Sequence, residues 1–183
     1  MKQNICKMVL GQAFVPAECA DLVDVIRTHL AHDNNKLRED LVCSLLGYSP
    51  SWGGAGHPDG YKPDETPVDV KSGPIIKFPD GGNTIVKKLD WTCLVHEYTE
   101  KGDLIYICEV LVSDIIDELI ESAEVLTKKK QRVSPMVSST VWLNAPHTVC
   151  RYKNPEHFRT TSKTGKIIKL DKLIDQLPYH KED

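Results

Sequence analysis

The feature that most constrains this chain is a short run of alternating apolar and charged side chains, Pro67-Val68-Asp69-Val70-Lys71-Ser72. In a β-strand, successive side chains point to opposite faces, so Asp69 and Lys71 share one face while Val68 and Val70 share the other. The apolar face can be buried against a core. We therefore expect a strand here, with a carboxylate and an ammonium group side by side at the surface of a sheet.

A second carboxylate precedes that strand. Asp59 lies ten positions before Asp69, and the segment 62–66 between them is rich in turn-forming residues, so a hairpin would bring the two together. Two carboxylates beside a lysine suit an oxygen-preferring divalent cation such as Mg²⁺, for which the carbonyl of Val70 is a further candidate ligand. Asp64 is an alternative to Asp59, but it lies only five positions before Asp69, which leaves little chain for a hairpin.

These groups could support hydrolysis of a phosphodiester bond. A metal ion held by Asp59 and Asp69 would polarise the phosphate and acidify a bound water molecule. Lys71 lies near enough along the strand to orient that water or to stabilise negative charge. His57 is a candidate for positioning the substrate, with an exposed loop histidine as the alternative. The structural alternative for the whole motif is a surface hairpin whose charges are only solvated.

Pro58-Asp59 and Asp69-Val70-Lys71 resemble the motif of the PD-(D/E)xK nuclease family, which includes many type II restriction endonucleases and several repair and junction-cleaving nucleases. The match covers these five residues, which lie in a helix–hairpin context at about residues 36–73. It implies a restriction-endonuclease-like fold and Mg²⁺-dependent cleavage of double-stranded DNA that leaves 5′-phosphate and 3′-hydroxyl ends. It also implies a glutamate from a preceding helix at the metal site, and Glu39 is the matching candidate. A salt-bridged or snorkelling Glu39 is the alternative.

The pattern of the remaining chain predicts its elements. With 183 residues, of which 40% are hydrophobic and 27% charged, one globular domain is expected. Helices are predicted at 17–31, 36–46, 114–126 and 171–177, and strands at 84–89, 91–98, 104–112, 137–143 and 148–152. This order predicts an α/β (α+β) fold in which helices flank a central mixed β-sheet. No run approaches the roughly 18 apolar residues of a membrane span, and no signal peptide is recognisable, so we expect a cytoplasmic protein without a membrane partner.

Charge is distributed unevenly along the chain. Residues 1–125 contain 11 Lys and Arg against 21 Asp and Glu, whereas residues 126–172 contain 11 against two. This asymmetry predicts an acidic catalytic side and a basic side that faces DNA phosphates, with a solvated basic tail as the alternative. The candidate DNA contacts are Lys128, Lys129, Lys130, Arg132, Arg151 and Lys153.

These expectations combine into one hypothesis. Residues 1–183 form a single nuclease domain, with a helical part at 1–47, a catalytic core at 57–126 and a basic, DNA-contacting part at 127–183. The expected activity is that of a sequence-specific, Mg²⁺-dependent DNA endonuclease similar to type II restriction enzymes. A homodimer is expected because palindromic sites call for two-fold symmetry. The alternatives are a structure-selective repair or junction-cleaving nuclease, and a non-catalytic DNA-binding domain whose Asp/Lys cluster is structural.

Overall fold

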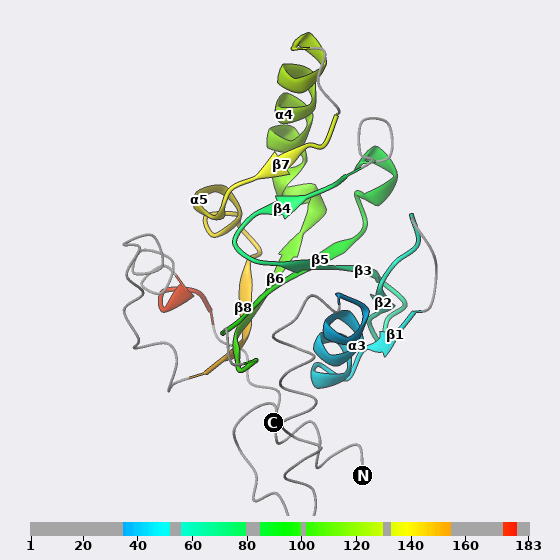
Figure 1. Cartoon of the computed structure of the whole chain (residues 1–183), viewed down its shortest axis with the longest axis vertical. Helices are drawn as coiled ribbons and strands as arrows, with labels where there is room; N and C mark the ends of the chain where they lie inside the picture. Colours follow the sequence, from blue (N-terminus) through cyan, green and yellow to red (C-terminus); the bar gives the residue numbers. More distant parts are fainter. Residues whose placement is uncertain are drawn as a thin grey trace, which may run out of the picture.

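A six-stranded mixed sheet forms the centre of the molecule in a computed structural model that describes residues 35–51, 56–79, 85–99, 102–129, 133–154 and 174–178 (Figure 1). Its strand order is β1-β2-β3-β5-β6-β8. Only β3 and β5 are parallel; the other neighbours are antiparallel. The strands are β1 (Ser49–Pro50), β2 (Gly60–Tyr61), β3 (Pro67–Ser72), β5 (Thr92–Tyr98), β6 (Leu104–Leu111) and β8 (Val149–Lys153).

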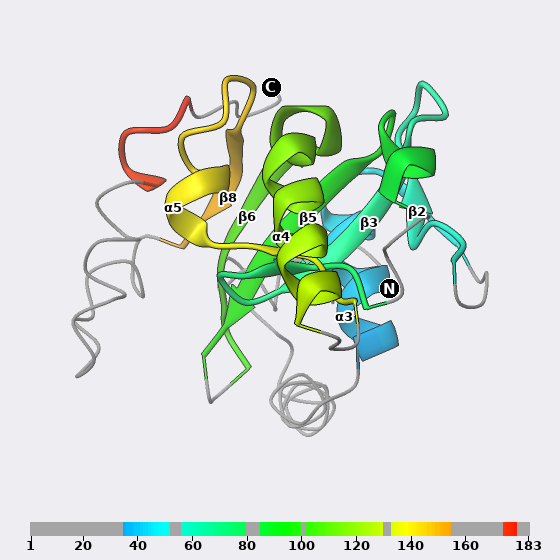
Figure 2. The same ribbon diagram turned by 90° about the horizontal axis from the view of Figure 1, so that it is seen from above.

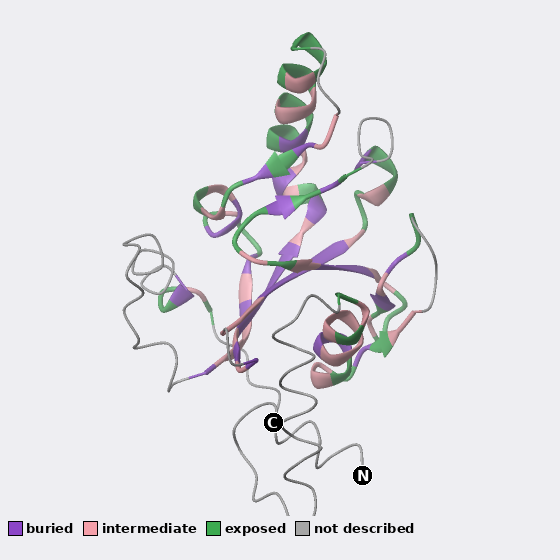
Figure 3. Ribbon diagram, in the orientation of Figure 1, coloured by how far each residue is buried: buried purple, intermediate pink, exposed green. Residues whose placement is uncertain are grey.

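Helices cover both faces of this sheet. Helix α3 (Asn35–Leu45) packs on one face, where its Val42 and Cys43 join a core with Val68 and Val70. Helix α4 (Ile116–Lys128), preceded by the 3₁₀ turn η3 (Val112–Ile115), packs on the other face and buries Leu119. Figure 2 shows the two helices on opposite sides of the central strands, and Figure 3 shows those strands as the most buried part of the molecule. The predicted mixed α/β architecture is confirmed.

The alternation predicted for the strand at 67–72 is present in β3. Val68 and Val70 are buried against α3, whereas Asp69 and Lys71 point to the opposite face. The preceding hairpin is also present, since β2 pairs with β3 and places Gly60 opposite Val68. The predicted elements at 36–46, 91–98, 104–112, 114–126 and 148–152 correspond to α3, β5, β6, η3 with α4, and β8.

Two predicted strands are wrong. Residues 85–88 form a 3₁₀ turn, η2 (Ile85–Lys88), in which side chains three positions apart lie on the same side. This turn buries Ile85 and directs Lys88 toward Asp69, which a strand with a two-residue period would not do.

The predicted strand at 137–143 is instead a short strand followed by a helical turn. Strand β7 (Met136–Val137) pairs with β4 (Ile76–Lys77) in a small second sheet, and α5 (Ser139–Trp142) follows. The helical turn buries Trp142, whose indole N–H donates to the carbonyl of Pro74 at 3.0 Å. A buried indole needs such an acceptor, and this requirement prevails over the strand preference of the segment.

The predicted helix at 17–31 lies outside the described residues. Of the predicted helix at 171–177, only 174–177 is described, and Ile174 packs into the core on the α4 side. Within the described part of the chain, no helix is long and apolar enough to cross a membrane.

Candidate active site

The hairpin of β2 and β3 brings Asp59 alongside the strand that carries Asp69. The backbone N–H of Asp59 donates to the carbonyl of Val68 at 2.8 Å, and the N–H of Val70 donates to Asp59 Oδ2 at 2.7 Å. Asp59 is the residue directly before β2, and its side chain accepts the backbone hydrogen bond from Val70 that a further residue of the strand would accept. Because the N–H and C=O of one strand residue point to the same side, the Val70 carbonyl faces this edge as well.

Asp69 is the most enclosed group of the site. Its side chain is bound by two ammonium groups: Lys71 Nζ lies 2.5 Å from Oδ1 and Lys88 Nζ lies 2.9 Å from Oδ2. Only 5% of Asp69 is exposed. The expectation of a charged pair at the open surface of the sheet is therefore wrong for Asp69, since η2 covers it with Lys88.

The two carboxylates have opposite pKa shifts. Burial and the nearby charge of Asp69 raise the pKa of Asp59, although the hydrogen bond from Val70 N–H opposes them. Burial would also raise the pKa of Asp69, but the positive charges of Lys71 and Lys88 outweigh it and hold that pKa below its usual value. Burial alone would lower the pKa of Lys71, but the adjacent Asp69 raises it. Asp69 and Lys71 are thus a charged pair at neutral pH.

Glu39 lies on α3, within electrostatic range of Asp59. Burial raises the pKa of Glu39, and the charge of Asp59 raises it further. Its carboxylate also lies 3.7 Å from Lys36 Nζ, one turn earlier on the helix. Glu39 is thus paired with Lys36, as the salt-bridged alternative has it, and is within electrostatic reach of Asp59 and Lys71.

The fit of these residues to a metal ion can be tested from their chemistry. Among the described residues, no three His, Cys, Asp or Glu side chains lie close enough together to hold a metal ion. Mg²⁺ does not require three, because it commonly keeps several water ligands and binds one or two carboxylates. Asp59, Asp69 and the Val70 carbonyl supply that smaller oxygen set. A cation bound there would share the oxygens of Asp69 with Lys71 and Lys88 or take the place of one of them.

Lys88 is the site residue that sequence reasoning missed. Its ammonium group lies over the rings of Trp91 and Phe78, at 4.1 Å and 5.3 Å from their centroids, in addition to its contact with Asp69. The sequence pattern predicts a strand at 84–89, and a strand gives Lys88 no reason to approach Asp69. A lysine directly before the Leu89–Asp90 turn was the available signal.

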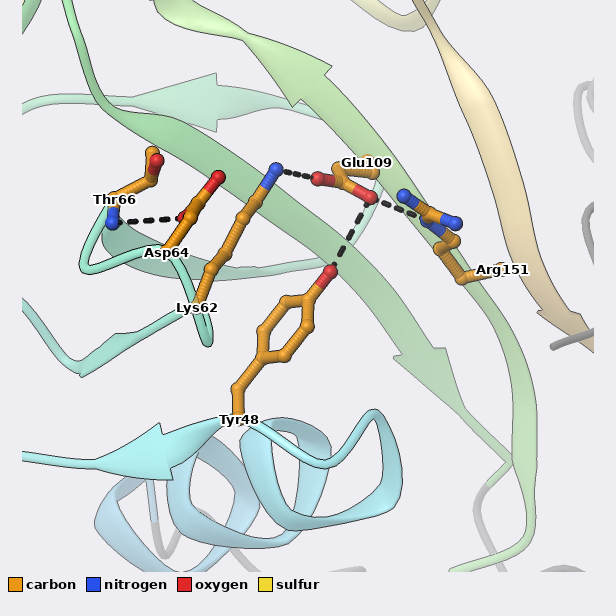
Figure 4. A network of polar contacts seen from close by, with 6 residues as sticks. All are labelled: Tyr48, Lys62, Asp64, Thr66, Glu109 and Arg151. Atoms are coloured by element: carbon orange, nitrogen blue, oxygen red, sulfur yellow. Dashed lines mark hydrogen bonds and ion pairs between the residues drawn. The ribbon is translucent and has the colours of Figure 1, made fainter.

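Two of the predicted DNA contacts have partners inside the molecule. Arg151 on β8 forms an ion pair with the buried Glu109 on β6, which also binds Lys62 and lies 3.5 Å from the Tyr48 hydroxyl (Figure 4). Lys153 forms an ion pair with Asp175. The Glu109 cluster lies on the α3 face of the sheet, because Glu109 pairs with Leu94 of the α3-side core, so it is separate from Asp69.

The remaining candidates that the structure describes are exposed. Lys128 and Lys129 are exposed at the end of α4, which in Figure 1 extends beyond the sheet, and Lys128 lies 3.9 Å from Glu124. Lys130 and Arg132 lie outside the described residues. His57 is exposed, which agrees with the alternative of an exposed loop histidine. Asp64 is exposed in the hairpin turn, where it accepts a hydrogen bond from Thr66 N–H (Figure 4).

No model of a known protein family matches this chain, and no curated protein matches it. The geometry around Asp59 and Asp69 therefore carries the functional argument.

Proposed function

We propose that this protein is a Mg²⁺-dependent endonuclease that hydrolyses phosphodiester bonds in double-stranded DNA and leaves 5′-phosphate and 3′-hydroxyl ends. One observation carries the proposal. The hairpin places the Asp59 carboxylate, the Val70 backbone and the Asp69–Lys71 pair at one edge of the sheet, although they are separated by up to 12 positions in the sequence. A PD-(D/E)xK nuclease and a restriction-endonuclease-like fold would have this arrangement.

The residues have distinct roles in the proposed reaction. Asp59, Asp69 and the Val70 carbonyl would hold Mg²⁺, which supplies Lewis-acid activation of the phosphate and of a water molecule. Asp69 suits this role because its lowered pKa keeps it ionised at neutral pH. Lys71 would orient the attacking water or stabilise the charge that develops on the phosphate. Glu39 would act through Asp59, as a further carboxylate at the rim of the site.

The biological setting of this activity is proposed from the family resemblance and the charge pattern. We favour a sequence-specific, type II-like enzyme that acts as a homodimer in the cytoplasm. The basic part after residue 126 contains Arg, Lys, Asn and Ser/Thr side chains that can contact phosphates and base edges. A structure-selective nuclease that cleaves branched or damaged DNA would use the same chemistry. It differs from a sequence-specific enzyme in the DNA substrate that it cleaves.

A second candidate function is supported by the pairing of Asp69. Both of its carboxylate oxygens contact lysines, as in a purely structural ion-pair cluster. A DNA-binding domain without catalytic activity would have no need for a metal ion at this edge. This candidate predicts that DNA binding is unaffected by Mg²⁺ and by chelators.

Incubation of the purified protein with a mixed-sequence plasmid and with a four-way junction tests these functions together. With Mg²⁺ present, discrete plasmid fragments are expected, and an excess of chelator should prevent them. Fragment ends should ligate without prior phosphorylation. Cleavage of the junction alone would support the structure-selective alternative. Retarded but intact DNA in Mg²⁺ would contradict the nuclease proposal and favour the non-catalytic domain.

A further inference from the structure

Asp69 has two lysine partners, one more than its single charge requires. Lys71 comes from the same strand and contacts Oδ1 at 2.5 Å. Lys88 comes from η2, outside the hairpin, and contacts Oδ2 at 2.9 Å. A buried carboxylate needs one such partner to stay charged, so the second ammonium group calls for a further explanation.

The surroundings of Lys88 hold its ammonium group independently of Asp69. Its Nζ lies 4.1 Å from the Trp91 ring centroid and 5.3 Å from that of Phe78. The faces of aromatic rings attract cations, most strongly those of Trp. If another cation occupied Asp69 Oδ2, Lys88 would therefore remain at the site instead of withdrawing into solvent.

A divalent cation at Asp69 Oδ2 would compete with the ammonium group of Lys88, because both are positively charged and would contact the same oxygen. In the structure Oδ2 faces Lys88, whereas Oδ1 faces Lys71. If a divalent cation occupied Asp69 Oδ2, the ammonium group of Lys88 would lose that contact, whereas the contact between Lys71 and Oδ1 could remain. A phosphate oxygen of a bound substrate would then be an anionic partner for Lys88.

We propose that Lys88 is a second cationic catalytic residue: it occupies Asp69 Oδ2 until a divalent cation binds, and then contacts a non-bridging oxygen of the scissile phosphate. No covalent bond forms at Lys88; it stabilises negative charge on the phosphate beside Lys71. The contact with the scissile phosphate rests on the proposed nuclease function. The competition with a cation at Oδ2 does not require that the protein cleaves DNA.

Three full-length variants test the proposal: Lys88→Met, Lys88→Arg and the control Lys87→Met. Methionine keeps an apolar stem against Trp91 and Phe78, and arginine keeps the charge. Lys87 is an exposed lysine of the same turn. Binding of Mn²⁺ alone is measured from the loss of its free electron paramagnetic resonance signal. Cleavage is measured in a single turnover at saturating Mg²⁺ and excess protein, with a melting curve for every variant.

We expect Lys88→Met to bind Mn²⁺ about fivefold more tightly or better, because a positive charge beside the ligand has been removed. Its single-turnover rate should fall by about 100-fold, as on loss of one charge-stabilising group. Lys88→Arg should keep wild-type Mn²⁺ affinity and recover part of the rate, and Lys87→Met should match the wild type in both.

Wild-type cleavage by a folded Lys88→Met protein would overturn the catalytic role, and unchanged Mn²⁺ affinity would overturn the competition at Oδ2. If the wild-type protein does not cleave DNA, the proposed function fails. In that case, tighter Mn²⁺ binding by Lys88→Met alone still supports the competition, whereas equal binding by all variants overturns this inference as well. The two failures are thereby distinguished.

Discussion

At the scale of single residues, Asp59 and Asp69 show how position changes the same functional group. Both carboxylates are removed from water, which favours their neutral forms. Asp69 contacts two ammonium groups and its pKa is lowered, whereas Asp59 accepts one backbone hydrogen bond, faces Asp69 and has a raised pKa. Their effects on stability should consequently have opposite signs at neutral pH.

Asp59→Asn should stabilise the protein while abolishing Mg²⁺-dependent cleavage. A raised folded-state pKa contributes stability only below the unfolded pKa, near 3.9, and that stability is lost as the pH rises through the folded pKa. The melting temperature of the variant should therefore exceed that of the wild type at pH 8, and the difference should shrink toward pH 4. Thermal unfolding across this range measures it. A variant that melts below the wild type at pH 8 would contradict the raised pKa of Asp59.

Asp69→Asn should have the opposite effect on stability. Removing the charge leaves Lys71 and Lys88 without their shared partner, a change that typically costs about 3–5 kcal/mol in a buried ion pair. Because the pKa of Asp69 is lowered, its contribution is present above the unfolded pKa and is lost as the pH falls through the folded pKa. Urea unfolding of both proteins at pH 7 and pH 3 tests this: the difference should be large at pH 7 and smaller at pH 3. Equal stability at pH 7 would refute it.

Lys71→Ala distinguishes a catalytic from a structural lysine. If its charge acts on the attacking water or the phosphate, the single-turnover rate should fall by about 100- to 1000-fold, with little change in DNA affinity. Lys71→Arg should rescue poorly, because a planar guanidinium does not replace a compact ammonium group. Rapid mixing with enzyme in excess measures the rate. A lysine that only pairs with Asp69 would instead cost stability and leave that rate near the wild-type value.

At the scale of elements, the local pattern predicted β3 well, because the two-residue period of its apolar side chains matches the face of the strand that is packed against α3. Val68 and Val70 need a core, and α3 supplies it on the side opposite Asp69. The hairpin was also predictable, since turn-forming residues stand between the two carboxylates. These two local facts were enough to bring Asp59, Asp69 and Lys71 together from the sequence.

The elements that were predicted incorrectly depend on distant contacts. The 3₁₀ turn η2 forms where Ile85 reaches the core and Lys88 reaches Asp69, which is 19 positions away. Trp142 finds its acceptor at Pro74, 68 positions away. Neither partner is visible in a local pattern. Glu109 did leave a signal, because a charge within the apolar run 104–112 must have buried partners, but the sequence does not identify them as Lys62 and Arg151.

The junction between α3 and β2 should tolerate no side chain at Gly60. A Cβ there would lie 2.7 Å from Cys43 Sγ and 2.9 Å from the carbonyl oxygen of Ser49. Gly60→Ala should therefore destabilise the protein by about 1–3 kcal/mol, and it should weaken Mn²⁺ binding because Asp59 is the preceding residue. Urea unfolding and the Mn²⁺ titration measure the two effects.

Cys43→Ala provides the control for this junction. It removes the sulfur but not the Ser49 oxygen, so the double variant should recover part of the lost stability. If the changes in the free energy of unfolding of the two single variants add fully in the double variant, Gly60 and Cys43 do not interact, and the close approach is contradicted.

At the scale of the whole molecule, the candidate site and β8, which carries Arg151 and Lys153 of the basic part, occupy different strands of one sheet. The site is on β2 and β3, and β8 with Arg151 is three strand spacings from β3. Three spacings correspond to about 14 Å, well below one turn of DNA at about 34 Å. The Glu109–Arg151 pair nevertheless lies on the α3 face of the sheet, opposite Asp69, so a duplex over Asp69 would not contact Arg151 on that face. Arg151 and Lys153 are engaged with acidic partners, so exposed lysines such as those at the end of α4 should carry more of the phosphate contact.

Replacing Lys128, Lys129 and Lys130 with glutamine tests this arrangement. Each lost phosphate contact should reduce the slope of the logarithm of the DNA association constant against the logarithm of the salt concentration by about 0.9. If all three lysines contact phosphates, this slope should therefore fall by about 2.7. Fluorescence anisotropy with a labelled duplex at several salt concentrations measures the slope. Arg151→Gln is the comparison, because its charge is paired with Glu109: it should reduce stability more than it reduces the slope. An unchanged slope in the triple variant would mean that the end of α4 does not contact the duplex and that the basic run is only solvated.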